Sequence, residues 1–239
     1  MFVVEGAKVL AEALAAGTVE SVYLDPAGAG PVEVELARRC LDAGGRVFEL
    51  DKGVLERITG TVTPQPVLGV AVDPTVALTA LEGSGPTLVV VCVEVRDPGN
   101  AGTLLRSAAA AGADAVVACD GSVDVLNPKT VRASAGAVFR VPVVNGGAAP
   151  EVLATLAAWG LCRLGAVARG GVDHVEADLR APTALVLGNE ATGLPFGTDG
   201  CLDGRVTIPM AGGTESLNVG IAAAVLCFEA ARQRRGARR

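Results

Sequence analysis

The sequence predicts an α/β protein with a mostly parallel sheet, built as two unequal parts. Half of the 239 residues are hydrophobic and only 3% are aromatic, so the core must consist mainly of Val, Ala and Leu. Short Val-rich runs, which are typical of strands buried on both faces, alternate with Ala-rich stretches of helical period. This alternation is the pattern of parallel α/β architectures. A segment rich in turn-forming residues, 73–86, is the best candidate for a boundary.

The first part, residues 1–75, is expected to be a small α/β unit. The segment EGAKVLAEALAA (5–16) predicts a helix that Gly17 ends, and PVEVELARRCLDAG (31–44) predicts a helix that begins at Pro31. The remaining elements predicted here are strands at 19–24, 46–50 and 66–72 and a short helix at 52–59. A linker over 76–86 follows.

The second part, residues 87–239, begins with TLVVVCVEV (87–95), a continuous apolar run that suits a buried strand. Further strands are predicted at 114–119, 140–144, 161–168, 183–188 and 205–210. Helices are predicted within 97–113, 127–139 and 149–160, and a last one from near Ser216 to 231. We expect each part of the chain to have a sheet and a core of its own.

The charge of the chain argues against broad, nonspecific attraction to nucleic acid. The formal net charge is −6. Residues 1–80 hold 11 acidic and 6 basic side chains, so the first part carries nearly all of this excess. Proteins that bind nucleic acid nonspecifically usually show a basic stripe instead.

Cysteine spacing and hydropathy favour a soluble, cytoplasmic protein. The six cysteines include no C-x-x-C pair, so neither a zinc site nor a disulfide framework is expected, and we predict no metal. The N-terminus lacks the shape of a signal peptide. No uncharged apolar run approaches the roughly 18 residues that span a bilayer.

Three predicted strand ends carry dense Gly and polar residues: 93–113, 185–195 and 208–224. In an open parallel sheet, ligands bind at the carboxyl ends of strands. Neither a phosphate-binding P-loop nor a G-x-G-x-x-G motif occurs, which argues against a P-loop NTPase and a Rossmann dehydrogenase. Each stretch also has a purely structural explanation: Asn100 and Ser216 as helix caps, and glycines as turn formers.

Together, the three stretches resemble the ordered motifs of the SpoU (TrmH) group of SPOUT RNA methyltransferases. The first motif is Asn-x-Gly-x-x-x-Arg, at Asn100, Gly102 and Arg106. The second is an apolar strand followed by GNEATGL (188–194), and the third is IPM, a short loop and SLNV (208–219). The segment NPKTVRASAGAVFRVPV (127–143) also looks like the connecting segment of that family, and the likeness covers 88–232.

The first part resembles the small α/β substrate-binding unit that precedes the catalytic domain in many rRNA 2′-O-methyltransferases, a unit similar to certain ribosomal proteins. FVVEGAKVL (2–10) and ITGTVTPQPVLGVA (58–71) carry this likeness. The sequence departs from relatives at Pro66, where they usually have Gly, and it lacks the basic segment that many of them carry before the first EG.

The resemblance implies methyl transfer from S-adenosylmethionine (SAM) to an RNA ribose 2′-hydroxyl, with rRNA as the expected substrate. It also implies a trefoil knot in the catalytic domain and a homodimer with cofactor sites near the interface. The implied catalytic residues are Asn100, Arg106, Glu190, Ser216 and Asn218. The implied cofactor-binding residues are Leu187, Gly188, Asn189, Gly193, Ile208, Met210, Ser216 and Leu217. Candidates for RNA contacts are Arg38, Arg39, Arg106 and Arg132.

Several alternatives stay open. A guanidinium is effectively never neutral, so we expect Arg106 to bind a phosphate and stabilise negative charge rather than act as a base. Asn100 would orient the arginine or the ribose, and Glu190 could accept a hydrogen bond from the substrate or from Asn100. Arg132 could contact a phosphate or form a salt bridge. The substrate could be tRNA, and a catalytically silent RNA-binding protein on the same scaffold is the alternative from another class.

Overall fold

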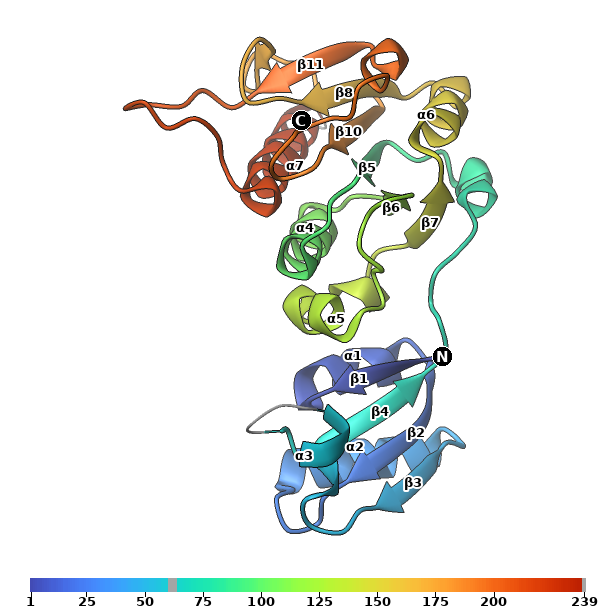
Figure 1. Ribbon diagram of the computed structural model, residues 1–239. Helices are drawn as coiled ribbons and strands as arrows, with labels where there is room; N and C mark the ends of the chain where they lie inside the picture. The colour runs from blue at the N-terminus through green and yellow to red at the C-terminus, as the bar shows by residue number, and fades with distance from the viewer. Residues whose placement is uncertain (60–63, 238–239) are drawn as a thin grey trace.

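The computed structural model describes residues 1–59 and 64–237 and contains two sheets, one in each part of the chain (Figure 1). Residues 60–63, which belong to the segment carrying the N-terminal resemblance, lie outside the described residues. Within the described ranges, no helix combines the length and the apolar composition that crossing a bilayer requires.

The N-terminal sheet has four strands. Its order is β1 (Phe2–Glu5), β4 (Val67–Ala71), β2 (Val19–Leu24) and β3 (Arg46–Glu49). Strand β4 is antiparallel to β1 and β2, whereas β2 and β3 are parallel. The helices of this part are α1 (Ala7–Ala15), α2 (Pro31–Asp42) and α3 (Val54–Thr59). The predicted elements are present, and β1 is an addition that the sequence analysis missed.

The C-terminal sheet has seven strands, and every neighbouring pair is parallel, as the sequence predicted. The order is β7 (Val143–Gly147), β6 (Ala115–Cys119), β5 (Leu88–Cys92), β10 (Thr183–Leu187), β8 (Cys162–Ala166), β11 (Gly204–Thr207) and β9 (Val172–Asp173). The two-residue strand β9 was not predicted. Because adjacent strands run the same way, their carboxyl ends lie at one edge, where loops can build a binding site.

Helices cover both faces of this sheet. One face packs against α4 (Pro98–Ala111), α5 (Pro128–Ser134) and α7 (Val219–Ala237). The other packs against α6 (Ala149–Ala158) and the 3-10 helix η1 (Leu78–Ser84), which lies in the predicted linker. Two further 3-10 helices are η2 (Ala137–Phe139) and η3 (Asp199–Cys201). The last helix begins at Val219, so the expected start near Ser216 is wrong.

Helix α4 lies between α5 and α7 and is the central helix of its layer. Gly102 explains how closely α4 approaches α5. A Cβ atom at this position would lie 2.4 Å from the Cβ of Ala133 and 2.8 Å from the backbone nitrogen of Ser134. The glycine of the first motif therefore serves helix packing.

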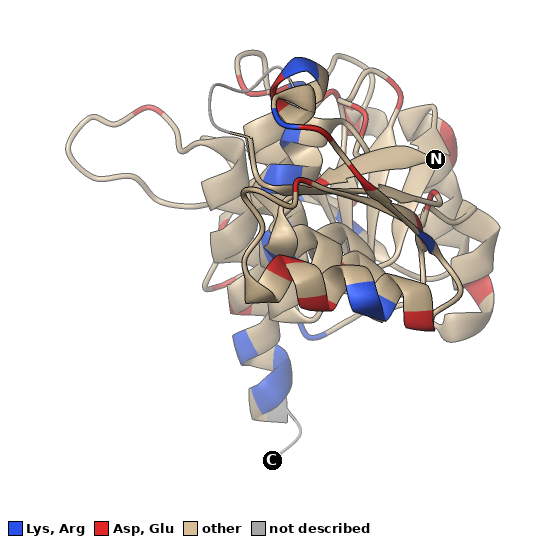
Figure 2. Cartoon of the chain, turned by 90° about the horizontal axis from the view of Figure 1, so that it is seen from below, with Lys and Arg blue, Asp and Glu red and all other residues tan. Residues whose placement is uncertain are grey.

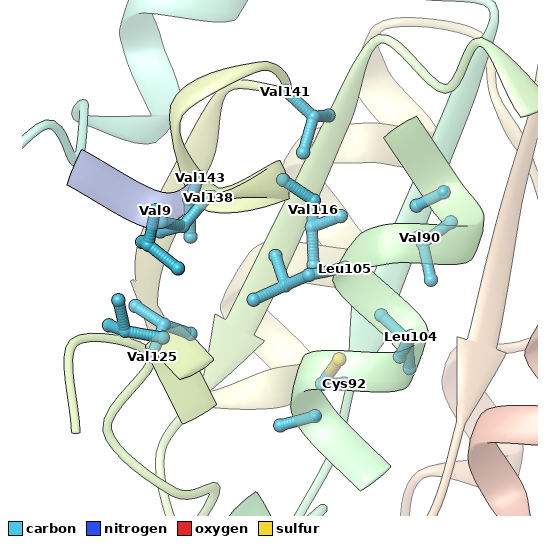
Figure 3. Close-up of a cluster of buried hydrophobic side chains, with 14 of the residues drawn as sticks. Val9, Val90, Cys92, Leu104, Leu105, Val116, Val125, Val138, Val141 and Val143 are labelled. Atoms are coloured by element: carbon cyan, nitrogen blue, oxygen red, sulfur yellow. The ribbon is translucent and has the colours of Figure 1, made fainter. Parts of the chain in front are cut away.

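The cores of the two parts are continuous, so the expectation of separate cores is wrong. Buried side chains of α1 and β1 belong to the same cluster as those of α4, α5 and the C-terminal sheet. Figure 3 shows Val9 of α1 beside Val138 and Val143. The rings of Phe2 and Phe139 stack with their centroids 5.9 Å apart.

Two ion pairs border this shared core. Arg140 donates from Nε to Glu12 at 2.8 Å and pairs with the same carboxylate through Nη2. Arg132 pairs with Glu5, whose side chain is almost fully buried. Of the two alternatives for Arg132, the structure therefore has the salt bridge.

Candidate active site

A cavity of about 520 Å³ opens at the carboxyl ends of β8, β10 and β11. The loops that follow these three strands and the first turns of α7 form its walls. All eight residues that the resemblance assigned to the cofactor line it: Leu187, Gly188, Asn189, Gly193, Ile208, Met210, Ser216 and Leu217. Residues from two separate motifs thus line one cavity. Roles as helix caps or turn formers would not explain why they meet there.

The loop after β10 folds back tightly on itself. Asn189 and Gly193 exchange backbone hydrogen bonds of 2.8 and 2.9 Å. The Asn189 side chain accepts the backbone N–H of Ala191 at 2.9 Å and donates to the carbonyl of Glu94 at 3.0 Å. Gly188 has no room for a side chain, because a Cβ atom would lie 2.4 Å from the carbonyl carbon of Gly193. The Gly-Asn pair therefore shapes the cavity wall.

One hydrogen-bonded chain connects the three motifs. The Asn100 amide donates to Glu190 Oε1 at 2.9 Å, and its oxygen accepts from Asn218 Nδ2 at 2.6 Å. The backbone N–H groups of Asp97 and Arg96 also donate to the Glu190 carboxylate, at 3.2 and 3.4 Å. Glu190 lines the cavity, so this chain lies at its edge.

Glu190 is held as a carboxylate. Partial burial acts to raise its pKa, but hydrogen bonds from Asn100, from the backbone at Glu190 itself and from Asp97 and Arg96 outweigh it and leave the pKa lowered. At neutral pH the group is therefore an acceptor that fixes the Asn100 amide, because a carboxylate with a lowered pKa holds no proton to give.

Neither Asn100 nor Ser216 caps a helix, so the capping explanation for these two residues is wrong. Asp97, followed by Pro98, caps α4 by accepting the N–H of Asn100 at 2.8 Å, so Asn100 is free to reach Glu190. Asn218 caps α7 by accepting from Gly220 and Ile221 at 2.9 and 3.2 Å. Ser216 is not the cap. It is exposed, lines the cavity and lies in the segment 208–218, which projects outward between β11 and α7 in Figure 1.

The four arginine candidates lie outside the cavity lining. Arg106 is exposed on α4 and forms no hydrogen bond or ion pair with the part of the chain that the structure describes. Arg38 is held by Glu35 at 2.7 Å and by Asp42. Arg39 is half-buried on the same helix, and Arg132 is occupied by Glu5. Of the four, Arg106 alone is both exposed and without a partner among the described residues.

Comparison with known proteins assigns the chain to a family. Residues 87–228 match the model of the SpoU rRNA Methylase family, and residues 1–69 match that of the MRM3-like substrate binding domain. The chain belongs to the SpoU rRNA methylase family.

Relatives from this family align with nearly the whole chain. The 23S rRNA (guanosine(2553)-2′-O)-methyltransferase RlmP of Bacillus subtilis is 32% identical over 228 residues, covering 95% of this chain and 87% of that protein. The 23S rRNA (guanosine-2′-O-)-methyltransferase RlmB of Xanthomonas axonopodis pv. citri is 36% identical and covers 93% and 92%. The crystal structure of the SpoU methyltransferase AviRb from Streptomyces viridochromogenes in complex with AdoMet superposes with a TM-score of 0.86, at 29% identity, covering 98% of this chain and 91% of that one.

The SpoU motifs do not account for the whole cavity. Residues 166–168, at the carboxyl end of β8, form part of the wall, and so do Asp199 and Arg205, which pair at 2.8 Å. They were not predicted, because which segments meet at the site depends on the strand order β10, β8, β11, and strand order is not visible in one sequence. Among the described residues, no group of three or more His, Cys, Asp or Glu side chains could hold a metal ion.

Proposed function

We propose that this protein transfers a methyl group from SAM to a ribose 2′-hydroxyl of RNA, with rRNA as its substrate. One observation carries the proposal: residues of the second and third SpoU motifs line one cavity, and hydrogen bonds of Asn100 with Glu190 and Asn218 join the first motif to its edge. Residues 1–75 would select the RNA and residues 87–239 would perform the transfer, with 76–86 between them. The trefoil knot of the family is part of the same proposal, as is the cytoplasmic location that an rRNA substrate implies.

The cavity suits SAM in size and chemistry. Its volume of about 520 Å³ lies within the usual range for pockets that enclose small ligands. Leu187, Ile208 and Leu217 offer apolar contacts for an adenine ring, and the backbone groups of the tight 188–193 loop offer hydrogen bonds. Bound SAM supplies a methyl carbon made electrophilic by its sulfonium.

The hydrogen-bonded chain would orient the RNA ribose. Glu190 fixes the Asn100 amide from one side, and Asn218 fixes it from the other. An amide held at both ends presents a constant polar surface to an incoming sugar. Most of the rate enhancement would come from holding the hydroxyl in line with the methyl carbon, because positioning removes the entropic cost of bringing two reactants together.

Arg106 fits this scheme as an electrostatic group supplied by a second copy of the chain. As a planar cation, it would bind the phosphate beside the target ribose and stabilise negative charge on the oxygen. In its own chain it lies on the exposed side of α4, outside the cavity lining. Helix α7, which packs beside α4, exposes Ile221 and Phe228. We therefore propose a homodimer that covers these side chains and brings Arg106 to the cavity of the partner.

The length and names of the relatives favour rRNA over tRNA. The RlmP and RlmB relatives described above, both named as 23S rRNA enzymes, align over 93 to 95% of this chain, including the N-terminal part. The tRNA-modifying TrmH/SpoU enzyme of A. aeolicus covers 67% of it, with a TM-score of 0.56. A catalytically silent RNA-binding protein would have no need to keep the intact constellation of Asn100, Glu190 and Asn218.

Calorimetric titration with SAM tests the first requirement of the proposal. We expect one binding site per chain, in the presence of rRNA if the substrate completes the site. Absence of binding at millimolar SAM, with and without rRNA, would reject an enzymatic function. A chelator should leave transfer unchanged, because the methyl donor leaves as a neutral thioether that needs no Lewis acid.

A further inference from the structure

The loop between β5 and α4 contains an unusual backbone conformation at Glu94. Its φ angle is +56°, and among the described residues Ala135 is the one other non-glycine residue with a positive φ. Such a conformation costs on the order of 1 kcal/mol or more for a residue with a side chain. It is held in place because the Glu94 carbonyl accepts the Asn189 amide of the cavity wall at 3.0 Å. The strain therefore lies within the active-site loops.

The Glu94 side chain holds an arginine beside the hydrogen-bonded chain of the three motifs. Arg96 Nη2 lies 2.6 Å from Glu94 Oε2, and the Arg96 side chain is 66% exposed. The backbone N–H of Arg96 donates to Glu190 Oε2 at 3.4 Å. Arg96 is thus anchored through its backbone to the carboxylate at the cavity edge, while its guanidinium faces solvent with one surface partner.

The charges around the cavity make this cation significant. The ionisable residues of the lining are Glu190, Asp199, Arg205 and Glu215, and Arg205 is already paired with Asp199. A phosphate that approaches a ribose at this edge therefore meets carboxylates. Arg169, next to the lining at Ala168, and Arg106 are exposed, but neither contacts the Glu190 chain within the described residues. Arg96 is the cation attached to that chain.

We propose that Arg96 binds an RNA phosphate adjacent to the target ribose and that Glu94 is the internal counter-ion which this phosphate displaces. The inference rests on the proposed function and adds a phosphate-binding residue to it. An exposed ion pair contributes between about 0 and 1 kcal/mol, so the exchange is inexpensive. A guanidinium can bind a phosphate through two parallel hydrogen bonds, which makes the new pair the stronger one. Before the substrate binds, the ion pair with Glu94 reduces the attraction of Arg96 for unrelated polyanions.

Arg96→Ala in the full-length protein tests the first half of the proposal, with 23S rRNA transcripts as the probe. The substitution keeps the backbone N–H that bonds to Glu190. We expect KM for RNA to rise about tenfold at low salt, and the slope of log KM against log salt to fall by roughly 0.7 to 1, the change expected for one lost phosphate contact. SAM affinity should remain within twofold. Arg96→Lys should recover the salt slope and only part of KM, because it keeps the charge without the planar fork.

Variants of Glu94 test the second half. Glu94→Gln removes the counter-ion and should tighten binding to unrelated RNA several-fold, and combination with Arg96→Ala should abolish this gain. Glu94→Gly should do the same and also raise the melting temperature, because glycine adopts the positive φ without strain. Arg180→Ala is the matched control, since Arg180 also pairs with a carboxylate two residues away, Asp178 at 2.9 Å, and is 62% exposed. It should leave KM and the salt slope unchanged.

The outcomes separate this inference from the proposed function. If the wild-type protein methylates rRNA and Arg96→Ala has the same KM and salt slope as Arg180→Ala, the phosphate role of Arg96 is refuted. If Arg96→Ala weakens binding but Glu94→Gln does not strengthen it, the counter-ion role of Glu94 is refuted. If the wild-type protein transfers no methyl group to RNA although it binds SAM, the proposed function itself fails.

Discussion

At the scale of single residues, Glu190 has the most connected role in the site. Its carboxylate receives an amide from the first motif and two backbone N–H groups from the loop before α4. Glu190 holds Asn100, and Asn100 in turn accepts from Asn218. The Glu190 side chain therefore determines how the first and third motifs face each other. Glu190, Asn100 and Asn218 are all polar, but they satisfy one another's hydrogen-bonding groups and leave the cavity edge ordered.

Glu190→Gln should therefore affect both rate and acid stability. We expect kcat to fall on the order of 10- to 100-fold, because Asn100 loses its fixed orientation. The lowered pKa of Glu190 means that its carboxylate stabilises the folded state above the unfolded pKa, about 4.3, and that this contribution is lost as pH falls through the folded pKa. The difference in melting temperature between wild type and variant should be constant near pH 7 and shrink below about pH 4. A difference that grows on acidification would contradict this account.

Gly188→Ala tests the shape of the cavity wall. The added methyl group would lie 2.4 to 2.5 Å from backbone atoms of Gly193 and Leu194, so the loop must move. We expect a loss of about 1 to 3 kcal/mol in the free energy of unfolding and at least a tenfold loss in SAM affinity, measured by denaturation and calorimetry. Gly200→Ala is the control, since nothing lies within 4 Å of the added atom. Equal effects of the two variants would show that the close approach at Gly188 does not matter.

The motif residues of the cavity were predictable because motifs at strand ends point to one edge of a parallel sheet. The capping alternatives were wrong for a local reason: Asp97 followed by Pro98 is itself a cap signature, and it lies three residues before Asn100. The isolated position of Arg106 was not predictable, because it depends on how α4 packs against its neighbours. The strained backbone of Glu94 has no sequence signal, since glutamate normally avoids positive φ.

At the scale of elements, the sequence predicted best where a strand or helix is long and apolar. The two strands it missed, β1 and β9, contain four and two residues, and they exist through pairing with β4 and β11. The contact between the two parts of the chain could not be predicted either. It combines α1 and β1 with α5 and η2, which lie more than a hundred residues further along.

This contact can be tested by exchanging an ion pair across it. Arg140 lowers the pKa of Glu12, chiefly through their hydrogen bond, and the two charges attract. Arg140→Glu should destabilise the protein by repulsion, and the double variant Glu12→Arg/Arg140→Glu should recover part of the loss. A double-mutant cycle in the free energy of unfolding should give a coupling of about 0.2 to 1 kcal/mol, typical of partly exposed pairs. If the effects of the two single substitutions simply add in the double variant, the ion pair contributes nothing to the contact.

At the scale of the whole molecule, one chain contains the cavity but does not bring Arg106 to it. The proposed homodimer would supply the missing group and cover Ile221 and Phe228, which are 48% and 46% exposed on α7. Light scattering should report twice the mass of the 23.9 kDa chain. Phe228→Glu should shift the mass toward the monomer and abolish transfer, whereas Val172→Glu, at an exposed position on strand β9, should leave the mass unchanged. An active wild-type monomer would contradict the arrangement.

The distribution of charge also limits how the molecule selects RNA. Basic and acidic residues are interspersed along most of the ribbon in Figure 2, and the net charge is −6. Specific contacts and shape must therefore dominate over general attraction to phosphates. Removal of the N-terminal part would expose Val138 and Phe139 as well as remove the RNA contacts proposed for it. For this reason, truncation alone cannot assign substrate selection to that part, and point variants on its surface are the better test.

The most direct test of the central claim is the chemical position of the transferred methyl group. Full-length protein is incubated with 23S rRNA and SAM labelled in the methyl group, and the RNA is then hydrolysed in alkali. A 2′-O-methyl group prevents the neighbouring phosphodiester from being cleaved, so the account predicts label in alkali-stable dinucleotides. Under the same conditions this label should fall about 10- to 100-fold with Glu190→Gln and be absent with Arg106→Ala. Label recovered in mononucleotides would show methylation of a base and would contradict the proposed ribose 2′-O-methyl transfer.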